Sequence, residues 1–261
     1  MQKRIGAGEI MIQIIFSWII GSILGSFITC WCDRSIRGQS ILFGRSHCDT
    51  CGQVIGKRDL IPVVSFIRLK GRCRACGAPI GKACLINEIF TALFFAYFAY
   101  RWGWHLWSVR LAGLLLILLA ISTIDLSEKI IPDALIAAGI LWWILTTWLL
   151  RLSFLKGLMG GMALGALVWL TALIVDHVLN RESLGGGDIK LFFMTGLYLT
   201  INFAFFHLLL SACIGLFIYG LWHRKNDHHE DEMAFGPAIS MSTMICICIE
   251  PFIVRLFSLF I

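Results

Sequence analysis

The stretch Leu191–Trp222 reads LFFMTGLYLTINFAFFHLLLSACIGLFIYGLW, and it decides the fold class because it contains no Asp, Glu, Lys or Arg. The hydrocarbon core of a bilayer is about 30 Å thick and needs roughly 20 apolar residues per helix. The stretch is too long for one such helix and short for two. We therefore predict two short membrane helices, separated by a break near residues 200–202.

Similar apolar runs recur along the chain of 261 residues and predict further membrane helices. Hydrophobic residues make up 58% of the chain and charged residues 15%, whereas a soluble domain is about a quarter charged. The other predicted helices cover residues 10–32, 83–100, 111–124, 134–150, 157–175 and 233–249. We therefore predict an all-α polytopic membrane protein with about eight transmembrane helices, of which the first is an anchor rather than a cleaved signal peptide.

Basic residues lie mainly in the loops at residues 33–82, 125–133, 176–190 and 223–232. These loops contain 10, 1, 2 and 2 Lys or Arg, which is 15 of the 22 in the chain. Cytoplasmic loops of membrane proteins carry an excess of Lys and Arg, so we predict that these loops are cytoplasmic and that both termini lie outside. The net charge of +6 follows from this asymmetry, and we expect no nucleic-acid partner.

Four of the ten cysteines form two Cys-x-x-Cys pairs, Cys48 with Cys51 and Cys73 with Cys76. Four thiolates in this arrangement can close a tetrahedral structural zinc site. A disulfide pair or free thiols are the alternatives, and a cytoplasmic location disfavours disulfides. We predict a small zinc-ribbon-like module over residues 33–82. The His-rich loop 223–232 is interpreted as solvated rather than as a second metal site.

Two aspartates border predicted membrane helices on the same, cytoplasmic side. Asp125 ends the third helix, and Asp188 begins the sixth directly after three glycines. Helix capping is the commoner role of a lone aspartate, but an ionisable residue beside a membrane helix is a functional candidate by default. Two carboxylates that share one site can activate water with one group and protonate a carbonyl oxygen with the other.

The predicted positions on the helices also differ between the two aspartates. Asp125 would lie at a helix C-terminus, where the macrodipole disfavours negative charge, and Asp188 at a helix N-terminus, where it favours negative charge. We therefore predict that Asp188 is the ionised base that activates water and that Asp125 is the protonated acid.

Five stretches of the chain together resemble bacterial type IV prepilin peptidases, which are GxGD-type aspartic proteases. They are GSILGSF (21–27), the double Cys-x-x-Cys segment that continues into the second helix (45–95), IDLSEKIIPD (124–133), GGGDIKL (185–191) and FGPAI (235–239). The resemblance spans nearly the whole chain. It implies that Asp125 and Asp188 are the catalytic residues and that the segment with the four cysteines is the family's zinc ribbon.

The resemblance also implies a substrate and a location. Such an enzyme cuts the short basic leader of prepilins or pseudopilins at the cytoplasmic face of the bacterial inner membrane, just before the hydrophobic helix of the substrate. Members often also methylate the new N-terminal residue from S-adenosylmethionine. The implied roles are in type IV pilus assembly, type II secretion or competence, with the lipid bilayer as the second partner.

We predict that residues near the catalytic motifs form a wall of the substrate site. For Glu88, a structural role is the alternative. The predicted wall residues are Gly185, Gly186, Gly187, Lys190 and Glu88.

The chain divides into a first transmembrane helix (1–32), a zinc-binding module (33–82) and a seven-helix membrane peptidase domain (83–261). The competing interpretation is an ion- or proton-coupled transporter in which the aspartates relay protons. That interpretation leaves the cysteine module unexplained.

Overall fold

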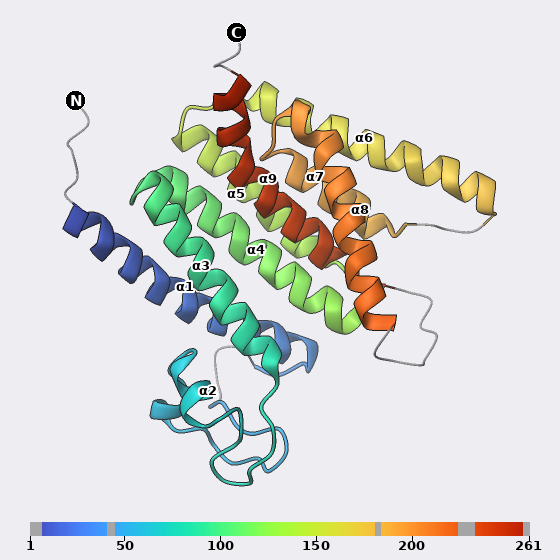
Figure 1. Ribbon diagram of the computed structural model, residues 1–261. Coiled ribbons are helices and arrows are strands. Elements are labelled where there is room, and N and C mark those ends of the chain that lie inside the picture. The colour runs from blue at the N-terminus through green and yellow to red at the C-terminus, as the bar shows by residue number, and fades with distance from the viewer. Residues whose placement is uncertain (1–6, 41–44, 181–183, 224–232, 258–261) are drawn as a thin grey trace. The chain divides into compact units, whose positions relative to one another are not determined.

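The computed structural model describes residues 7–40, 45–180, 184–223 and 233–257, which form helices joined by loops (Figure 1). The helices are α1 Ala7–Ile36, η1 Lys57–Asp59, α2 Val64–Arg68, α3 Lys82–Trp102, α4 Leu106–Glu128, α5 Asp133–Leu149, α6 Phe154–Leu179, α7 Gly186–Gly196, α8 Ile201–His223 and α9 Gly236–Phe257. Extended pairing within the described ranges is limited to two isolated antiparallel bridges. The predicted all-α class is confirmed. The His-rich segment 224–232 lies outside the described residues.

The predicted membrane helices correspond to α1 and to α3 through α9. Among the described residues, α1, α3, α4, α6 and α8 are long and apolar enough to cross a membrane, and α5 and α9 are shorter apolar helices. The predicted break near residues 200–202 is confirmed, because α7 ends at Gly196 and α8 begins at Ile201.

The sixth predicted span is short in the structure, as the sequence predicted, but it begins and ends earlier in the chain. Its helix α7 has 11 residues, which at 1.5 Å per residue is about 16 Å, or roughly half the apolar thickness of a bilayer. α7 therefore does not cross a membrane by itself. Hydropathy reports apolar residues but not where a helix begins or ends, which is why the predicted span, from residue 191 to the break near 200, is displaced from the observed helix.

The helices belong to two compact units, Met1–Ala120 and Ile121–Ile261, which are described separately. The boundary falls within α4, so this helix contributes to both. Because the units are defined by contacts, they do not test the predicted division at residues 32 and 82, which stays a prediction.

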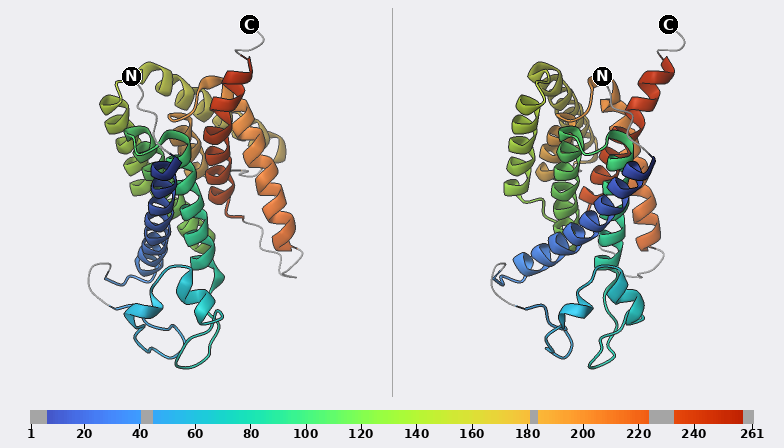
Figure 2. Two further views of the ribbon diagram at one scale, coloured as in Figure 1. Left: turned by 60° about the vertical axis from the view of Figure 1, so that its left-hand side comes forward. Right: turned by 90° about the vertical axis from the view of Figure 1, so that its left-hand side faces the viewer.

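Close packing of α1 on α3 organises the first unit (Figures 1 and 2). A Cβ atom at Gly21 would lie 2.7 Å from the Thr91 carbonyl oxygen, and one at Gly25 would collide with the Thr91 side chain. Asn87 Nδ2 also donates a 3.0 Å hydrogen bond to Thr29 Oγ1 across the two helices. Small residues four apart allow membrane helices to approach this closely, which explains the GSILG stretch.

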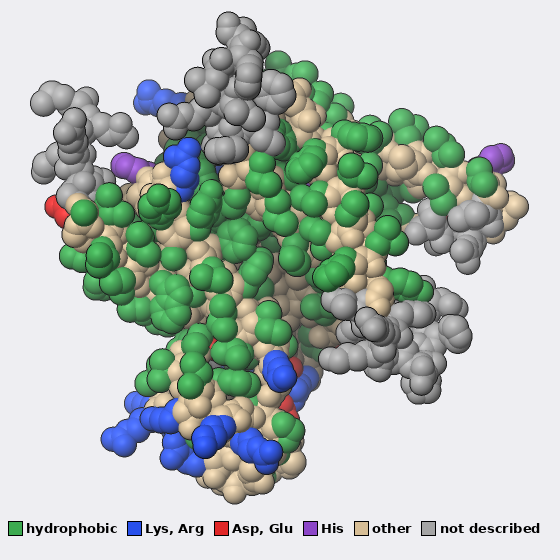
Figure 3. All heavy atoms as spheres, in the orientation of Figure 1, with side chains coloured by type: hydrophobic (Ala, Val, Ile, Leu, Met, Phe, Trp, Pro, Cys, Tyr) green, Lys and Arg blue, Asp and Glu red, His purple; other side chains and the backbone are tan. Residues whose placement is uncertain are grey.

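The module with the four cysteines lies beyond the Lys82 end of α3 (Figure 2). Figure 3 shows Lys and Arg side chains gathered over this module, whereas apolar side chains cover most of the α1 and α3 surface. The basic character of residues 33–82 is therefore also a feature of the surface.

Glycines on α6 position α7 in the second unit. Gly157, Gly161 and Gly165 recur every fourth residue, and Gly160 lies beside them. A Cβ atom at Gly160 would lie 2.6 Å from the carbonyl oxygen of Gly196 at the end of α7. The backbones of α6 and α7 are thus in direct contact, and this contact sets the position of the helix that carries Asp188.

A buried polar cluster joins α8 to α9. His207 is fully buried, and its Nε2 lies 2.8 Å from Thr243 Oγ1 and 3.1 Å from Ser242 Oγ. Both hydroxyls already donate to the Ile239 carbonyl oxygen, and each hydroxyl has only one proton to donate. We infer that the His207 ring carries its proton on Nε2 and donates it to α9.

Candidate functional site

The Asp125 carboxylate lies in the last turn of α4, against the first residue of α9. The Gly236 N–H donates a 2.7 Å hydrogen bond to Asp125 Oδ2, and only 4% of Asp125 is exposed. A Cβ atom at Gly236 would lie 2.7 Å from the same oxygen, so a larger residue there has to displace the carboxylate. The FGPAI stretch thus supplies a backbone donor that holds Asp125.

Asp188 lies in the first turn of α7, which agrees with its predicted place at the start of the sixth helix. The helix begins at Gly186, and the Asp188 N–H donates a 3.0 Å hydrogen bond to the carbonyl oxygen of Gly185, the N-cap residue. A Cβ atom at Gly186 would meet nothing within 4 Å, whereas one at Gly187 would lie 3.1 Å from Ile131 Cβ. The glycines therefore differ: Gly186 leaves open space near Asp188, and Gly187 allows a close approach to Ile131.

The second unit brings Asp125 and Asp188 within electrostatic range of each other, and Asp188 is half-buried. Nearby, Phe192 of α7 packs on Phe235, which directly precedes α9, with 6.2 Å between the ring centroids. Two neighbouring carboxylates disfavour a state in which both are charged. The arrangement can therefore hold one ionised and one protonated carboxyl group.

The two aspartates lie at the helix ends that the sequence predicted, but Asp125 also lies beside a second helix end. Asp188 lies at the N-terminus of α7. Asp125 ends α4 but also contacts the N-terminus of α9 through Gly236. Both N-termini favour negative charge. Helix dipoles therefore do not decide which carboxylate is ionised, and the assignment of Asp188 as the base stays a prediction.

Lys190 points to the start of α5. Its Nζ lies 2.7 Å from Asp133 Oδ1, and the two side chains are 53% and 74% exposed. Ion pairs this exposed are typically worth less than about 1 kcal/mol, so the contact adds little to the packing of α7 on α5. The role of Lys190 in the wall of the substrate site stays a prediction.

Glu88 lies in the first unit, buried in α3, where it contacts the cysteine module. Its Oε2 accepts a 2.7 Å hydrogen bond from the Val63 N–H, and its Oε1 accepts one of 3.3 Å from the Cys84 thiol. Val63 has a φ of 61°, a conformation that β-branched residues rarely adopt. Glu88 thus ties α3 to a strained turn before α2. These contacts support its structural interpretation, and its role as a site wall stays a prediction.

The four predicted ligand cysteines come together at one place. The Sγ atoms of Cys48, Cys51, Cys73 and Cys76 all lie within 4.8 Å of one another. The Cys48 and Cys76 sulfurs are 3.8 Å apart, and a tetrahedron with Zn–S bonds of 2.3 Å has edges of about 3.8 Å. The cluster therefore fits a tetrahedral zinc ion.

The two Cys-x-x-Cys pairs have the same turn geometry. In each, the glycine after the pair donates its N–H to the carbonyl oxygen of the first cysteine, from Gly52 to Cys48 at 2.8 Å and from Gly77 to Cys73 at 3.0 Å. The two glycines have φ values of 68° and 72°, which glycine adopts without steric cost. The fold thus presents both pairs of thiols in the same way.

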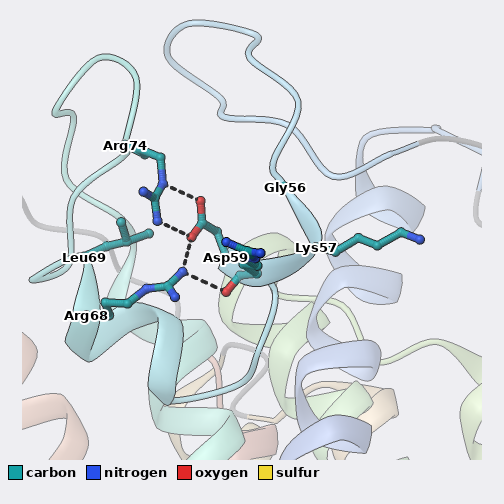
Figure 4. Close-up of a pocket in the computed structure, with 7 residues that line it drawn as sticks. Gly56, Lys57, Asp59, Arg68, Leu69 and Arg74 are labelled. Carbon is teal, nitrogen blue, oxygen red and sulfur yellow. Dashed lines mark hydrogen bonds and ion pairs between the residues drawn. The ribbon is translucent and has the colours of Figure 1, made fainter.

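A charged cluster links other parts of the module (Figure 4). Asp59 accepts hydrogen bonds of 2.8 Å from both Arg74 Nε and Arg74 Nη2 and one of 2.6 Å from Arg68 Nη2. These contacts, of which those with Arg74 are the strongest, lower the pKa of Asp59 to about 2. They connect η1 both to the end of α2 and to the second cysteine pair.

Two protein-family models match this chain. Residues 19–102 match the Bacterial Peptidase A24 N-terminal domain, and residues 112–220 match the Type IV leader peptidase family. The type 4 prepilin-like proteins leader peptide-processing enzyme of Escherichia coli is 33% identical over 222 residues, which are 81% of this chain and 78% of that protein. The chain belongs to the type IV leader peptidase family.

Other leader peptidases extend the comparison. The prepilin leader peptidase/N-methyltransferase of Aeromonas hydrophila is 32% identical over 215 residues, which are 80% of this chain and 72% of that protein. The enzyme of the same name from Myxococcus xanthus is 33% identical over 187 residues, or 71% of this chain, and this match spans 56% of its length. No solved structure matches the chain significantly. The predicted family is confirmed, and the transporter alternative has no support.

Two features that shape the site were not predicted from the sequence, namely the glycines of α6 and the contact between Gly236 and Asp125. The spacing of Gly157, Gly161 and Gly165 is a recognised signal of close helix packing and was there to be found. The contact of Gly236 with Asp125 joins residues 111 positions apart, and no local pattern predicts it.

Proposed function

We propose that this chain is a membrane aspartic endopeptidase that removes the short basic leader of type IV prepilins or pseudopilins at the cytoplasmic face of the bacterial inner membrane. The observation that carries the proposal is the proximity of Asp125 and Asp188 within one unit of a leader peptidase family member. The Gly236 N–H holds one of these carboxylates in place, and Gly186 leaves open space near the other.

In the proposed reaction, a water molecule is positioned by the two carboxyl groups. The ionised group takes a proton from the water as its oxygen attacks the scissile carbonyl carbon, and the protonated group donates to the carbonyl oxygen. When the tetrahedral intermediate collapses, the C–N bond breaks, the proton taken from water passes to the leaving amine, and one hydroxyl of the intermediate returns a proton to the carboxylate that had donated. Asp125 and Asp188 together thus supply every proton transfer of the hydrolysis.

The thiol cluster has a separate, structural role in this proposal. Cys48, Cys51, Cys73 and Cys76 would hold a zinc ion that fastens the two cysteine pairs together. Four protein thiolates fill the coordination sphere of zinc and leave no position for a substrate. The ion would therefore stabilise the module and take no part in hydrolysis.

We also propose that the enzyme methylates the new N-terminal residue of its product from S-adenosylmethionine. The support is that the Aeromonas and Myxococcus relatives are named prepilin leader peptidase/N-methyltransferase.

The proposed orientation places residues 33–82 in the cytoplasm and both termini outside. The ten Lys and Arg residues of this segment support it. Alkaline phosphatase fused after residue 261 should be active and after residue 82 inactive. The reverse result would reject the orientation. Functionally, we divide the chain into a first transmembrane helix (1–32), a zinc module (33–82) and a peptidase domain (83–261).

The decisive experiment is co-expression with a prepilin, followed by mass measurement of the product. Wild-type enzyme should remove the leader and add the mass of one methyl group. Asp125→Asn and Asp188→Asn should each abolish cleavage at normal membrane levels, whereas Asp176→Asn, a control at another helix end, should cleave normally. Substantial cleavage by either catalytic variant would reject the pair, since an aspartate that only caps its helix contributes about 1 kcal/mol of stability and no chemistry.

A further inference from the structure

The short helix α2 of the cysteine module has apolar side chains on two sides, and one of these sides is exposed. On the inner side, the Phe66 ring packs so closely on Gly71 that a Cβ atom there would lie 2.9 Å from its Cζ atom. On the outer side, Ile61, Val64 and Ile67 are exposed, Ile67 to 68%. The Ile61 carbonyl oxygen already accepts a helical hydrogen bond, so these side chains, three residues apart, share one face. We call them the α2 apolar face.

A hydrogen bond fixes the level of this face along α3, which is long and apolar enough to cross a membrane. The Val63 N–H, directly before α2, donates to Glu88 Oε2 at 2.7 Å. Glu88 follows Lys82, the first residue of α3, by six residues, which is about 9 Å along the helix. Figure 3 shows apolar side chains over α2 that continue those of α1 and α3. The α2 apolar face therefore lies beside the end of a membrane span, where headgroups meet acyl chains.

A basic recess adjoins the end of α2 (Figure 4). It has a volume of about 590 Å³, and its lining includes Lys57, Arg58, Arg68 and Arg74, with Asp59 as the one carboxylate. Asp59 accepts from Nε and Nη2 of Arg74 and from Nη2 of Arg68, so Nη1 of each arginine can still donate to a ligand. Figure 4 shows the Lys57 side chain extended away from Asp59. The recess thus keeps an excess of positive charge and N–H donors of the kind that bind phosphate.

The charge of the whole module indicates the kind of partner. Residues 33–82 contain ten Lys or Arg, three Asp and no Glu, so positive charge stays in excess even with four thiolates on a zinc ion. Anionic lipids give a membrane surface a negative potential that attracts basic segments beside a transmembrane helix. An apolar face and a basic recess at the end of a membrane span together match such a surface.

We propose that the cysteine module docks on the membrane surface, with the α2 apolar face in the interface and the basic recess on the phosphate groups of anionic phospholipids. Amphipathic segments bind membranes in this way, with apolar side chains buried about 5–10 Å into the boundary between headgroups and acyl chains and basic side chains on anionic lipids. The lipid surface would then hold the module beside α3 in addition to the hydrogen bond between Val63 and Glu88. The proposal involves neither the carboxylate pair nor a peptide substrate.

Site-specific photo-cross-linking tests the apolar part of the surface. Benzoylphenylalanine replaces Ile67 in the full chain, which is purified and placed in vesicles of phosphatidylcholine and phosphatidylglycerol. We expect a protein–lipid adduct in the mass of the irradiated protein. The matched control is the same probe at Val54, which is also apolar and 43% exposed but belongs to the loop of the first cysteine pair, farther from α3 than α2 is (Figure 2). No adduct at Ile67, or equal adducts at both positions, would overturn the proposal.

A lipid titration tests the basic recess. Purified protein in nonionic detergent is titrated with short-chain phosphatidylglycerol, short-chain phosphatidylcholine or inorganic phosphate, and the melting temperature is measured. Phosphatidylglycerol should stabilise the protein at the lowest concentration. Arg58→Ala should raise its half-maximal concentration roughly fivefold, as expected for one basic residue at an anionic surface, whereas Arg45→Ala, an exposed position outside the recess, should leave it unchanged.

The outcomes of the titration separate the partners. An equal response to both lipids would show that the negative charge is not recognised, and an equal response to phosphate would assign the recess to a free anion. Either result, or equal effects of Arg58→Ala and Arg45→Ala, would overturn the proposal. Neither measurement uses a prepilin, so the result does not depend on whether the proposed peptidase function holds.

Discussion

The contact between Gly236 and Asp125 makes a quantitative prediction for Gly236→Ala. The new Cβ atom would lie 2.7 Å from Asp125 Oδ2, and ordinary van der Waals contact begins at 3.4 Å, so the oxygen has to move by about 0.7 Å (3.4 minus 2.7). If the oxygen moves away from α9, its 2.7 Å hydrogen bond from the Gly236 N–H lengthens past the limit of about 3.2 Å.

A hydrogen bond to a neutral group, such as the protonated carboxyl predicted for Asp125, is worth about 0.5–1.5 kcal/mol, and each 1.36 kcal/mol changes a rate tenfold. We therefore expect Gly236→Ala to lower kcat for prepilin cleavage roughly 2- to 13-fold. KM should change little, because Gly236 contacts the Asp125 carboxylate and acts through its position. Alanine is also a better helix former than glycine by about 1 kcal/mol, so helix propensity will not destabilise α9.

The assay is cleavage of purified prepilin by enzyme in detergent, with thermal unfolding measured on the same samples. Gly220→Ala is the matched control, because a Cβ atom there would meet nothing within 4 Å, and it should cleave at the wild-type rate. A wild-type kcat for Gly236→Ala at a normal folded level would refute the reasoning. It would mean either that the carboxylate has room to move or that its position does not matter.

Three further predictions concern stability. Cys73→Ser should remove zinc from the purified protein and lower its membrane level, because a closed site loses most of its metal affinity with one ligand; zinc-free enzyme with full activity would contradict this. Asp59→Asn should lower the melting temperature at pH 7, because the folded pKa of Asp59 is about 2 against an ordinary 3.8. The stabilisation by ionised Asp59 is therefore fully present above pH 3.8 and disappears as the pH falls towards 2. The difference in melting temperature between Asp59→Asn and wild type should shrink over that range. A difference that stays constant would contradict this prediction. His207→Leu should cost about 1–3 kcal/mol of unfolding free energy; it should be non-additive with Thr243→Val, and additive effects would show that the pair is not coupled.

The sequence alone predicted the class of the protein and the residue types of its sites. Membrane helices follow from local composition, because the bilayer selects for length and for the absence of charge at each segment separately. The paired cysteines and the placement of Asp125 and Asp188 at helix ends are equally local. This is why the all-α fold, the break before α8 and the thiol cluster were predicted correctly.

Tertiary structure decided how these parts are held. Glu88 accepts the N–H of Val63, the α6 glycines determine how closely α7 approaches, and Gly236 brings the start of α9 to Asp125. Each contact joins residues far apart in the sequence and depends on packing distances within a few tenths of an ångström. Which of the two aspartates is ionised also depends on contacts between residues far apart in the sequence. A helix end assigned from the sequence describes only its own helix, whereas the field at Asp125 also depends on the N-terminus of the helix that packs against it.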